Sequence, residues 1–235
     1  MPEKIPLEEN KEFKSIRNEV VKIASDLKTA FDFYGKDDSE PSDETEEEDL
    51  EDLEYWSEQG DETQMYLLGK KYLDEYDDPE EAEHWLKQSA TKGNHLAMYM
   101  LYKCYRNGKI EDREGEKMKY LLMAVDKEYG FAEYEYSKIL AKTKSVMALE
   151  YMRQASRHGC PIAEYAIGKY FLERGGTEEA LPYLERAASK YTWARFYLGL
   201  LYFYKLDDKE KGIEYLRIAA EQNFDPARSA IRNIN

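Results

Sequence analysis

Histidine and cysteine are the residue types that most readily supply a metal ligand, a general base or a nucleophile. The chain has three histidines and two cysteines, namely His84, His95, His158, Cys104 and Cys160. The histidines do not have the H-E-x-x-H spacing, and the cysteines lack the C-x-x-C spacing of zinc and redox sites. The sequence therefore predicts no metal site, and two cysteines do not make a disulfide framework.

Glycine-rich phosphate-binding and nucleophile motifs are also missing from the sequence. It contains no G-x-x-x-x-G-K-[ST], no G-x-G-x-x-G and no G-x-S-x-G. The 49 acidic residues are too numerous for any single pair to mark an acid–base site. We therefore expect a protein that is not an enzyme and that uses no cofactor.

Tyrosine and lysine, in contrast, recur at fixed positions because the chain repeats one segment. Five copies begin at Gln64, Ala97, Ala132, Ala163 and Ala194, with the sequences QMYLLGKKYL, AMYMLYKCYR, AEYEYSKILA, AEYAIGKYFL and ARFYLGLLYF. A truncated sixth copy, ARSAIRNIN, begins at Ala227.

Each full copy is followed by a second segment that contains an aromatic residue and, four or five positions later, small residues. The aromatic residues are Trp85, Tyr120, Tyr151, Tyr183 and Tyr215. Both segments have the apolar spacing of helices, and one helix pair cannot bury its own apolar face. The sequence therefore predicts an all-α chain, an α-solenoid of about five stacked helix pairs. We expect these pairs to form a right-handed superhelix.

Turn and capping residues agree with these helices. Asp78 precedes Pro79 and two glutamates, which is typical of an N-cap, a proline at the first helical position and an acidic first turn. Glycine or asparagine follows the second helices, where a left-handed residue is favoured. These residues are Gly93, Gly130, Gly159 and Asn223.

The repeated segments resemble the Sel-one-like repeat family, a relative of the tetratricopeptide repeat. Its Leu-Gly-x-x-Tyr core is matched at Leu68-Gly69 with Tyr72, at Ile167-Gly168 with Tyr170 to Phe171, and at Leu198-Gly199 with Tyr202. Tyr102 and Ser137 replace the glycine in the second and third copies. The resemblance covers about residues 50–235, and it implies a scaffold in which the first helix of each pair lines a concave groove.

Two rows of residues would then face this groove, two positions before and two after the leucine. The first row is Tyr66, Tyr99, Tyr134, Tyr165 and Phe196. The second row is Lys70, Lys103, Lys138, Lys169 and Leu200, and Arg106 extends it. We call these the aromatic row and the lysine row.

The two rows predict a groove that binds an extended or helical peptide of a protein partner. The aromatic rings would supply contact area, and the lysines would select acidic residues and speed encounter. The alternative interpretation is structural, because tyrosine and lysine are common at these positions in the family and lysine is a good helix former.

The net charge of −15 comes from one segment of the chain. Residues 37–62 contain 15 Asp or Glu and no Lys or Arg, which leaves 34 acidic and 34 basic residues elsewhere. Such a segment is either a solvated spacer or an acidic arm that docks on a basic surface. The overall charge disfavours nucleic acid as a partner.

The first part of the chain predicts a separate helix over residues 8–34. Its apolar residues have three–four spacing: Phe13, Ile16, Val20, Ile23, Leu27, Ala30 or Phe31, and Tyr34. This helix would pack against the array, pair as a short coiled coil in a homodimer, or be offered to a partner. Acidic residues interrupt its basic face, which disfavours a membrane-surface helix.

Three regions follow from these patterns. They are an amphipathic helix at 1–35, an acidic linker with a capping helix at 36–62, and the repeat solenoid with a short C-terminal cap at 63–235. No apolar run is long enough to span a bilayer, and the start lacks the pattern of a signal peptide. These features predict a cytoplasmic protein.

The leading functional prediction is a non-enzymatic adaptor or scaffold that holds a partner in its groove. The alternative is an inhibitor or immunity-type protein that acts through its acidic arm, as a nucleic-acid mimic or a competitor. A third interpretation is a hydrolase, as proposed for some cysteine-rich relatives, but their disulfide spacing is absent here.

Overall fold

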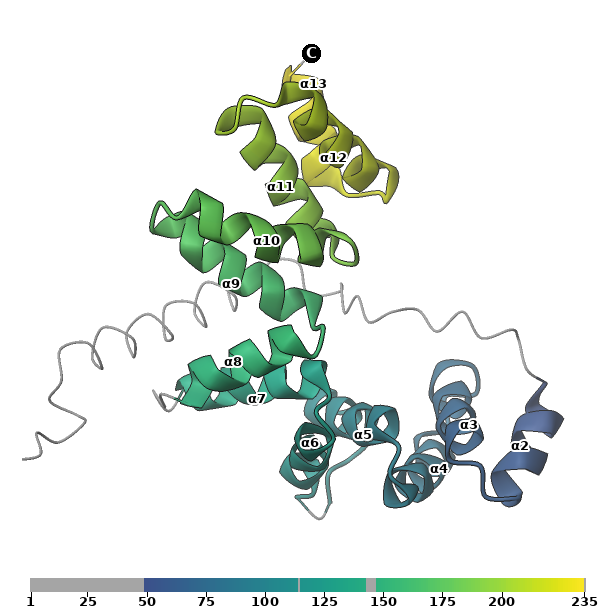
Figure 1. Cartoon of the computed structure of the whole chain (residues 1–235). Coiled ribbons are helices and arrows are strands. Elements are labelled where there is room, and N and C mark those ends of the chain that lie inside the picture. Colours follow the sequence, from purple (N-terminus) through teal and green to yellow (C-terminus); the bar gives the residue numbers. More distant parts are fainter. Residues whose placement is uncertain (1–48, 114, 143–146, 235) are drawn as a thin grey trace, which may run out of the picture. The chain divides into compact units, whose positions relative to one another are not determined.

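The computed structural model describes residues 49–113, 115–142 and 147–234 (Figure 1). These residues form twelve helices and no strand, which confirms the all-α prediction. The helices are α2 (Leu50–Glu58), α3 (Glu62–Asp74), α4 (Pro79–Lys92), α5 (His95–Asn107), α6 (Lys117–Asp126), α7 (Gly130–Lys142), α8 (Met147–Arg157), α9 (Pro161–Glu173), α10 (Thr177–Ala188), α11 (Thr192–Tyr204), α12 (Lys209–Glu221) and α13 (Asp225–Ile234).

The helices follow the five copies of the sequence repeat. The first helices are α3, α5, α7, α9 and α11, and each is followed by its second helix. Within pairs, α3 packs on α4, α9 on α10 and α11 on α12 (Figure 1). The truncated sixth copy is α13, which packs on α12. The described residues divide into two compact units, 49–136 and 137–234, with the boundary inside α7.

A glycine on the first helix lets the backbones of a pair approach closely. A Cβ atom added at Gly69 would lie 2.7 Å from Cγ of Leu86, and one at Gly168 would lie 2.8 Å from Cγ of Leu184. The same holds for Gly199 and Leu216 at 2.9 Å. These leucines are fully buried, so the side chain of the second helix fills the space that the glycine leaves.

The two copies without this glycine use other side chains. Ser137 is 1% exposed, and its Oγ lies 4.0 Å from Sδ of Met152 on α8. Methionine occupies the position of the leucine there, and its flexible chain adapts to irregular space. In the second copy the ring of Tyr102 is itself buried, at 3% exposed.

Neighbouring pairs are tied by tyrosine hydroxyls that donate to glutamates on the preceding second helix. Tyr105 donates to Glu83 at 2.6 Å, and Tyr202 donates to Glu185 at 2.7 Å. Tyr72 of α3 donates to Glu54 of α2 at 3.0 Å. The helix α2 therefore makes the same contact as the second helices of the full repeats.

The caps follow the sequence in most places. The Asp78 carboxylate accepts from the backbone N–H groups of Glu80 and Glu81, both at 3.1 Å. Gly93 ends α4 with φ of +108°. Gly130 was expected to end the helix before it, and this prediction is wrong. The left-handed residue is Glu128, so the chain turns two residues earlier and Gly130 begins α7.

Two of the sequence predictions lie outside the described residues. They are the helix over 8–34, with its coiled-coil homodimer, and the part of the acidic linker that precedes residue 49. The right-handed superhelix and the boundaries at 35 and 62 also stay predictions. Within the described part of the chain, no helix is both long and apolar enough to cross a membrane.

The glycine–leucine contact predicts how a larger residue would act. Gly168→Val should lower the free energy of unfolding by about 1–3 kcal/mol, because the new methyl groups have no space against Leu184. Denaturation in urea, followed by circular dichroism, measures this loss.

The double variant with Leu184→Ala tests the cause. Leu184→Ala alone should cost about 2–5 kcal/mol, and the combined cost should be smaller than the sum because the shortened side chain makes room. Additive costs would contradict the close contact.

Candidate functional site

The two rows predicted from the sequence lie on the first helices α3, α5, α7, α9 and α11. Each lysine-row residue follows its aromatic-row residue by four positions, so the two lie on one helix face. The rows extend over both compact units: Lys70 and Lys103 lie in one, and Lys138 and Lys169 lie in the other.

The aromatic row is more buried than a binding platform needs. Tyr66, Tyr99, Tyr134 and Tyr165 are 5%, 6%, 1% and 3% exposed, and Phe196 is half-buried. The ring of Tyr99 packs against Tyr129, with centroids 5.3 Å apart. Tyr165 packs against Tyr191 in the same way, also at 5.3 Å. These rings fill space between elements of the array and offer a partner little surface.

The lysine row is more accessible. Lys70, Lys103, Lys138 and Lys169 are each half-buried, as is Leu200. The Nζ atom of Lys103 lies 5.5 Å from the ring centroid of Tyr99, within the range of a cation–π contact. The aliphatic part of a lysine can cover apolar surface in this way while its charge stays near water.

Arg106 extends the lysine row, but it is committed to a partner within the chain. Its guanidinium lies 3.0 Å from Oε2 of Glu135 on α7, whose side chain is only 10% exposed. The hydroxyl of Tyr102 donates to the same oxygen at 3.4 Å. One carboxylate of α7 thus binds two side chains of α5.

The acidic members of the first helices were missed in the sequence. Glu135 and Glu164 are 8% and 6% exposed. Glu164 accepts from Nε of Arg186 at 2.7 Å, within the α9–α10 pair. Their place in the sequence pointed to this role, because both glutamates are next to an aromatic-row tyrosine. They were not singled out because the chain contains so many carboxylates.

Burial sets the protonation of several groups near these rows. Burial and then the charge of Glu135 raise the pKa of Tyr102 to about 12. Burial raises the pKa of the Cys104 thiol to about 11, so this thiol stays protonated at neutral pH. Burial and then Lys127 lower the pKa of His95. A protonated, buried thiol is a poor nucleophile.

The remaining histidines and cysteines are divided between the two units and between exposed and buried positions. His84 and His158 are exposed and lie in different units. Cys104 and Cys160 are both buried and unbridged. Among the described residues, no three His, Cys, Asp or Glu side chains are grouped so as to hold a metal ion.

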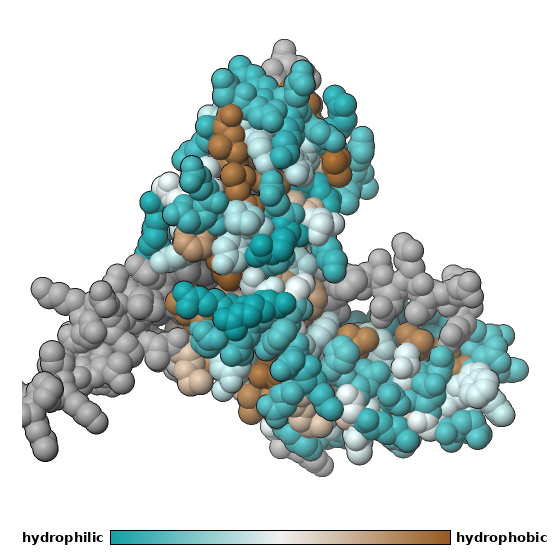
Figure 2. Space-filling model, viewed as in Figure 1, coloured by the Kyte–Doolittle hydropathy of each residue, from teal (hydrophilic) through white to brown (hydrophobic). Residues whose placement is uncertain are grey.

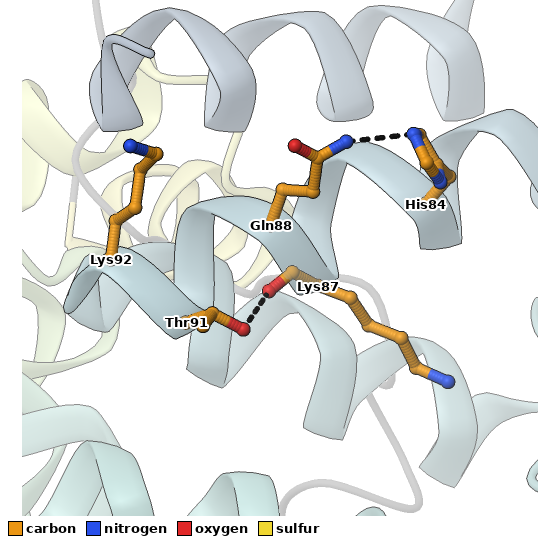
Figure 3. Close-up of a pocket in the computed structure, with 5 residues that line it drawn as sticks. All are labelled: His84, Lys87, Gln88, Thr91 and Lys92. Carbon is orange, nitrogen blue, oxygen red and sulfur yellow. Dashed lines mark hydrogen bonds between the residues drawn. The ribbon is translucent and has the colours of Figure 1, made fainter.

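A surface hollow of about 320 Å³ lies along α4, lined by His84, Lys87, Gln88, Thr91 and Lys92 (Figure 3). The side chains of His84 and Gln88 meet at 2.7 Å, whereas Lys87 points away from them (Figure 3). Lys87 is bound to Glu83 at 2.9 Å and to Glu116 at 3.2 Å. The lining side chains therefore do not converge on one position where a substrate atom could react.

The surface in view is mainly hydrophilic. Figure 2 shows its hydrophobic residues in small separate groups among polar ones.

Solved structures with the same arrangement identify the fold. A Sel1 repeat protein from Oxalobacter formigenes matches 79% of this chain and 59% of its own, with a TM-score of 0.68 and 22% identity. A protective antigen of uropathogenic Escherichia coli with an SLR fold matches 79% and 43%, with a TM-score of 0.60 and 22% identity. The chain has the SLR fold.

An immunity protein from Pseudomonas aeruginosa is also similar to this SLR chain. It matches 63% of this chain and 58% of its own, with a TM-score of 0.52 and 22% identity. The chain spans less than two thirds of each of these three proteins. No protein-family model and no curated protein sequence matches it. The family resemblance seen in the sequence is thus confirmed at the level of the SLR fold.

The ion pair between the partly exposed Arg106 and the buried carboxylate of Glu135 predicts unequal costs for two similar changes. Arg106→Ala should lower the free energy of unfolding by on the order of 3 kcal/mol, because it takes an ion pair from a buried carboxylate. Urea denaturation of the full chain provides the measurement.

The matched control is Lys109→Ala. Its ion pair with Asp74, at 3.7 Å, has side chains 58% and 54% exposed, so the loss should be about 0–1 kcal/mol. Equal losses for the two variants would contradict the role given to burial.

The raised pKa of Tyr102 predicts a loss of stability in alkali. An unfolded tyrosine ionises near pH 10, whereas the folded pKa is about 12. The contribution of Tyr102 to the free energy of unfolding is therefore complete below pH 10 and is lost as the pH rises toward 12. Tyr102→Phe should make this decline in the urea midpoint shallower. An unchanged slope would show that Tyr102 does not contribute to it.

Proposed function

We propose that this chain is a non-enzymatic adaptor that holds a segment of a partner protein along its first helices. The observation that carries the proposal is the lysine row, one half-buried cation at the same position of four consecutive first helices. A periodic row of charge suits a periodic ligand, such as an extended or helical peptide.

The chemistry of the row defines the partner. Lysines favour acidic residues, and the half-buried Phe196 and Leu200 at the end of the rows favour apolar ones. An exposed lysine contact contributes only about 0–1 kcal/mol, so affinity requires several contacts at once. The buried tyrosines then pack under the lysine row and contribute less contact area with the partner than the sequence suggested.

A second candidate is an immunity-type inhibitor that acts through the acidic segment. Two observations favour it. Residues 37–62 carry 15 acidic residues, and one protein of similar fold is an immunity protein. This inhibitor would dock on a basic surface of its target, the opposite preference to that of the lysine row.

Affinity capture from native lysate, read by mass spectrometry, separates the two candidates. If the chain is an adaptor, Lys103→Glu with Lys138→Glu should abolish capture of its partner, because two attractive contacts become repulsive. If it is an inhibitor, neutralising the acids from Asp43 to Asp52 should abolish capture instead.

The matched control is Lys190→Glu, an equal charge change at an exposed site outside the rows. It should leave capture unchanged. The adaptor proposal fails if this control weakens capture as much as a substitution in the lysine row.

A further inference from the structure

The helix α2 has one face against the array and another in solvent. Leu53 and Ser57 are buried, at 3% and 0% exposed, and Glu54 accepts the hydrogen bond from Tyr72 of α3. These contacts fix the rotation of α2 about its own axis. They determine which of its side chains point outward.

Two large aromatic side chains lie on the outward face. Tyr55 is 56% exposed and Trp56 is 52% exposed. Their rings meet edge to face, with centroids 5.1 Å apart and planes at 79°. Exposed tryptophan and tyrosine are the residue types most enriched at the centres of protein interfaces.

The helix that carries these two rings also carries exposed carboxylates. Glu51, Asp52 and Glu58 are exposed on the same helix, and α2 contains no lysine or arginine. Aromatic faces and carboxylates together suit arginine in particular. A guanidinium stacks on a ring and pairs with a carboxylate through two parallel hydrogen bonds.

We propose that this outward face, formed by Glu51, Asp52, Tyr55, Trp56 and Glu58, docks an arginine-bearing segment of a partner protein. The negative charge of the face selects a basic partner, and the two rings select arginine over lysine. The face shares no residue with the aromatic and lysine rows. Its occupant is therefore a different segment from the acidic one proposed for the rows.

Binding of labelled peptides to the full chain, measured by fluorescence anisotropy, tests this proposal. Nona-arginine should bind more tightly than nona-lysine of the same charge. Trp56→Ala and Tyr55→Ala should each weaken nona-arginine binding roughly twofold to fivefold, the size expected for an exposed cation–π contact.

Matched variants separate the α2 face from the general acidity of the chain. Tyr204→Ala removes a ring that is 67% exposed outside α2, and it should leave binding unchanged. Glu51→Gln with Glu58→Gln should weaken binding more than Glu210→Gln with Glu214→Gln, since those acids are exposed on α12. All the substituted residues are exposed, so the variants should keep the fold, and circular dichroism checks it.

Three results would overturn the proposal. The first is no binding of nona-arginine by the full chain, which would include the case of a face covered by another part of the chain. The second is equal affinity for both peptides. The third is binding that responds to the acids of α2 but not to Tyr55 and Trp56, which would indicate nonspecific attraction between opposite charges.

Discussion

The rest of the structure depends on the close approach of two helices at one glycine. At Gly69, Gly168 and Gly199 even a Cβ atom would overlap the leucine of the second helix. This contact lets a pair of short helices bury a leucine completely. The pair still has too little core to stand alone, so the next pair must cover its remaining face. The glycine–leucine contact is enough to hold two helices together but not enough to make the pair stable alone. The pairs therefore stack into an array.

Contacts between pairs use polar atoms of aromatic residues. Tyr72, Tyr105 and Tyr202 bury most of their rings inside the array and donate their hydroxyls to a glutamate of the preceding second helix. Tyrosine suits this position because its ring packs like a hydrophobic residue while its hydroxyl reaches the wetter edge. The same demand explains why α2, although it lacks a full repeat, carries Glu54 where the next tyrosine needs an acceptor.

The repeat could be predicted from the sequence because its glycines, aromatics and spacing each reflect a local requirement of a helix pair. The sequence also predicted which residues share one face of a helix. It did not predict how deeply each side chain is buried, because burial depends on which residues of other helices pack against it. The aromatic row shows this: Tyr66, Tyr99, Tyr134 and Tyr165 were expected at a groove surface and are nearly inaccessible. Arg106 shows it too, since its partner Glu135 is 29 residues away in the sequence and on another helix. The assignment of the two rows to a binding site stays a prediction. Of the two rows, the lysine row is the more accessible to a partner.

The charge pattern of the chain has a consequence for the number of partners. The first helices present lysines, whereas α2 presents carboxylates and two open rings. A ligand attracted by one surface is repelled by the other, and screening at physiological salt limits each attraction to about 8 Å. Because their charge preferences are opposite, the two proposed surfaces would not compete for one ligand. An acidic segment along the lysine row leaves the α2 face available to a basic one. Together, the two proposals give one chain two binding surfaces of opposite charge, an arrangement that a uniformly charged surface does not offer.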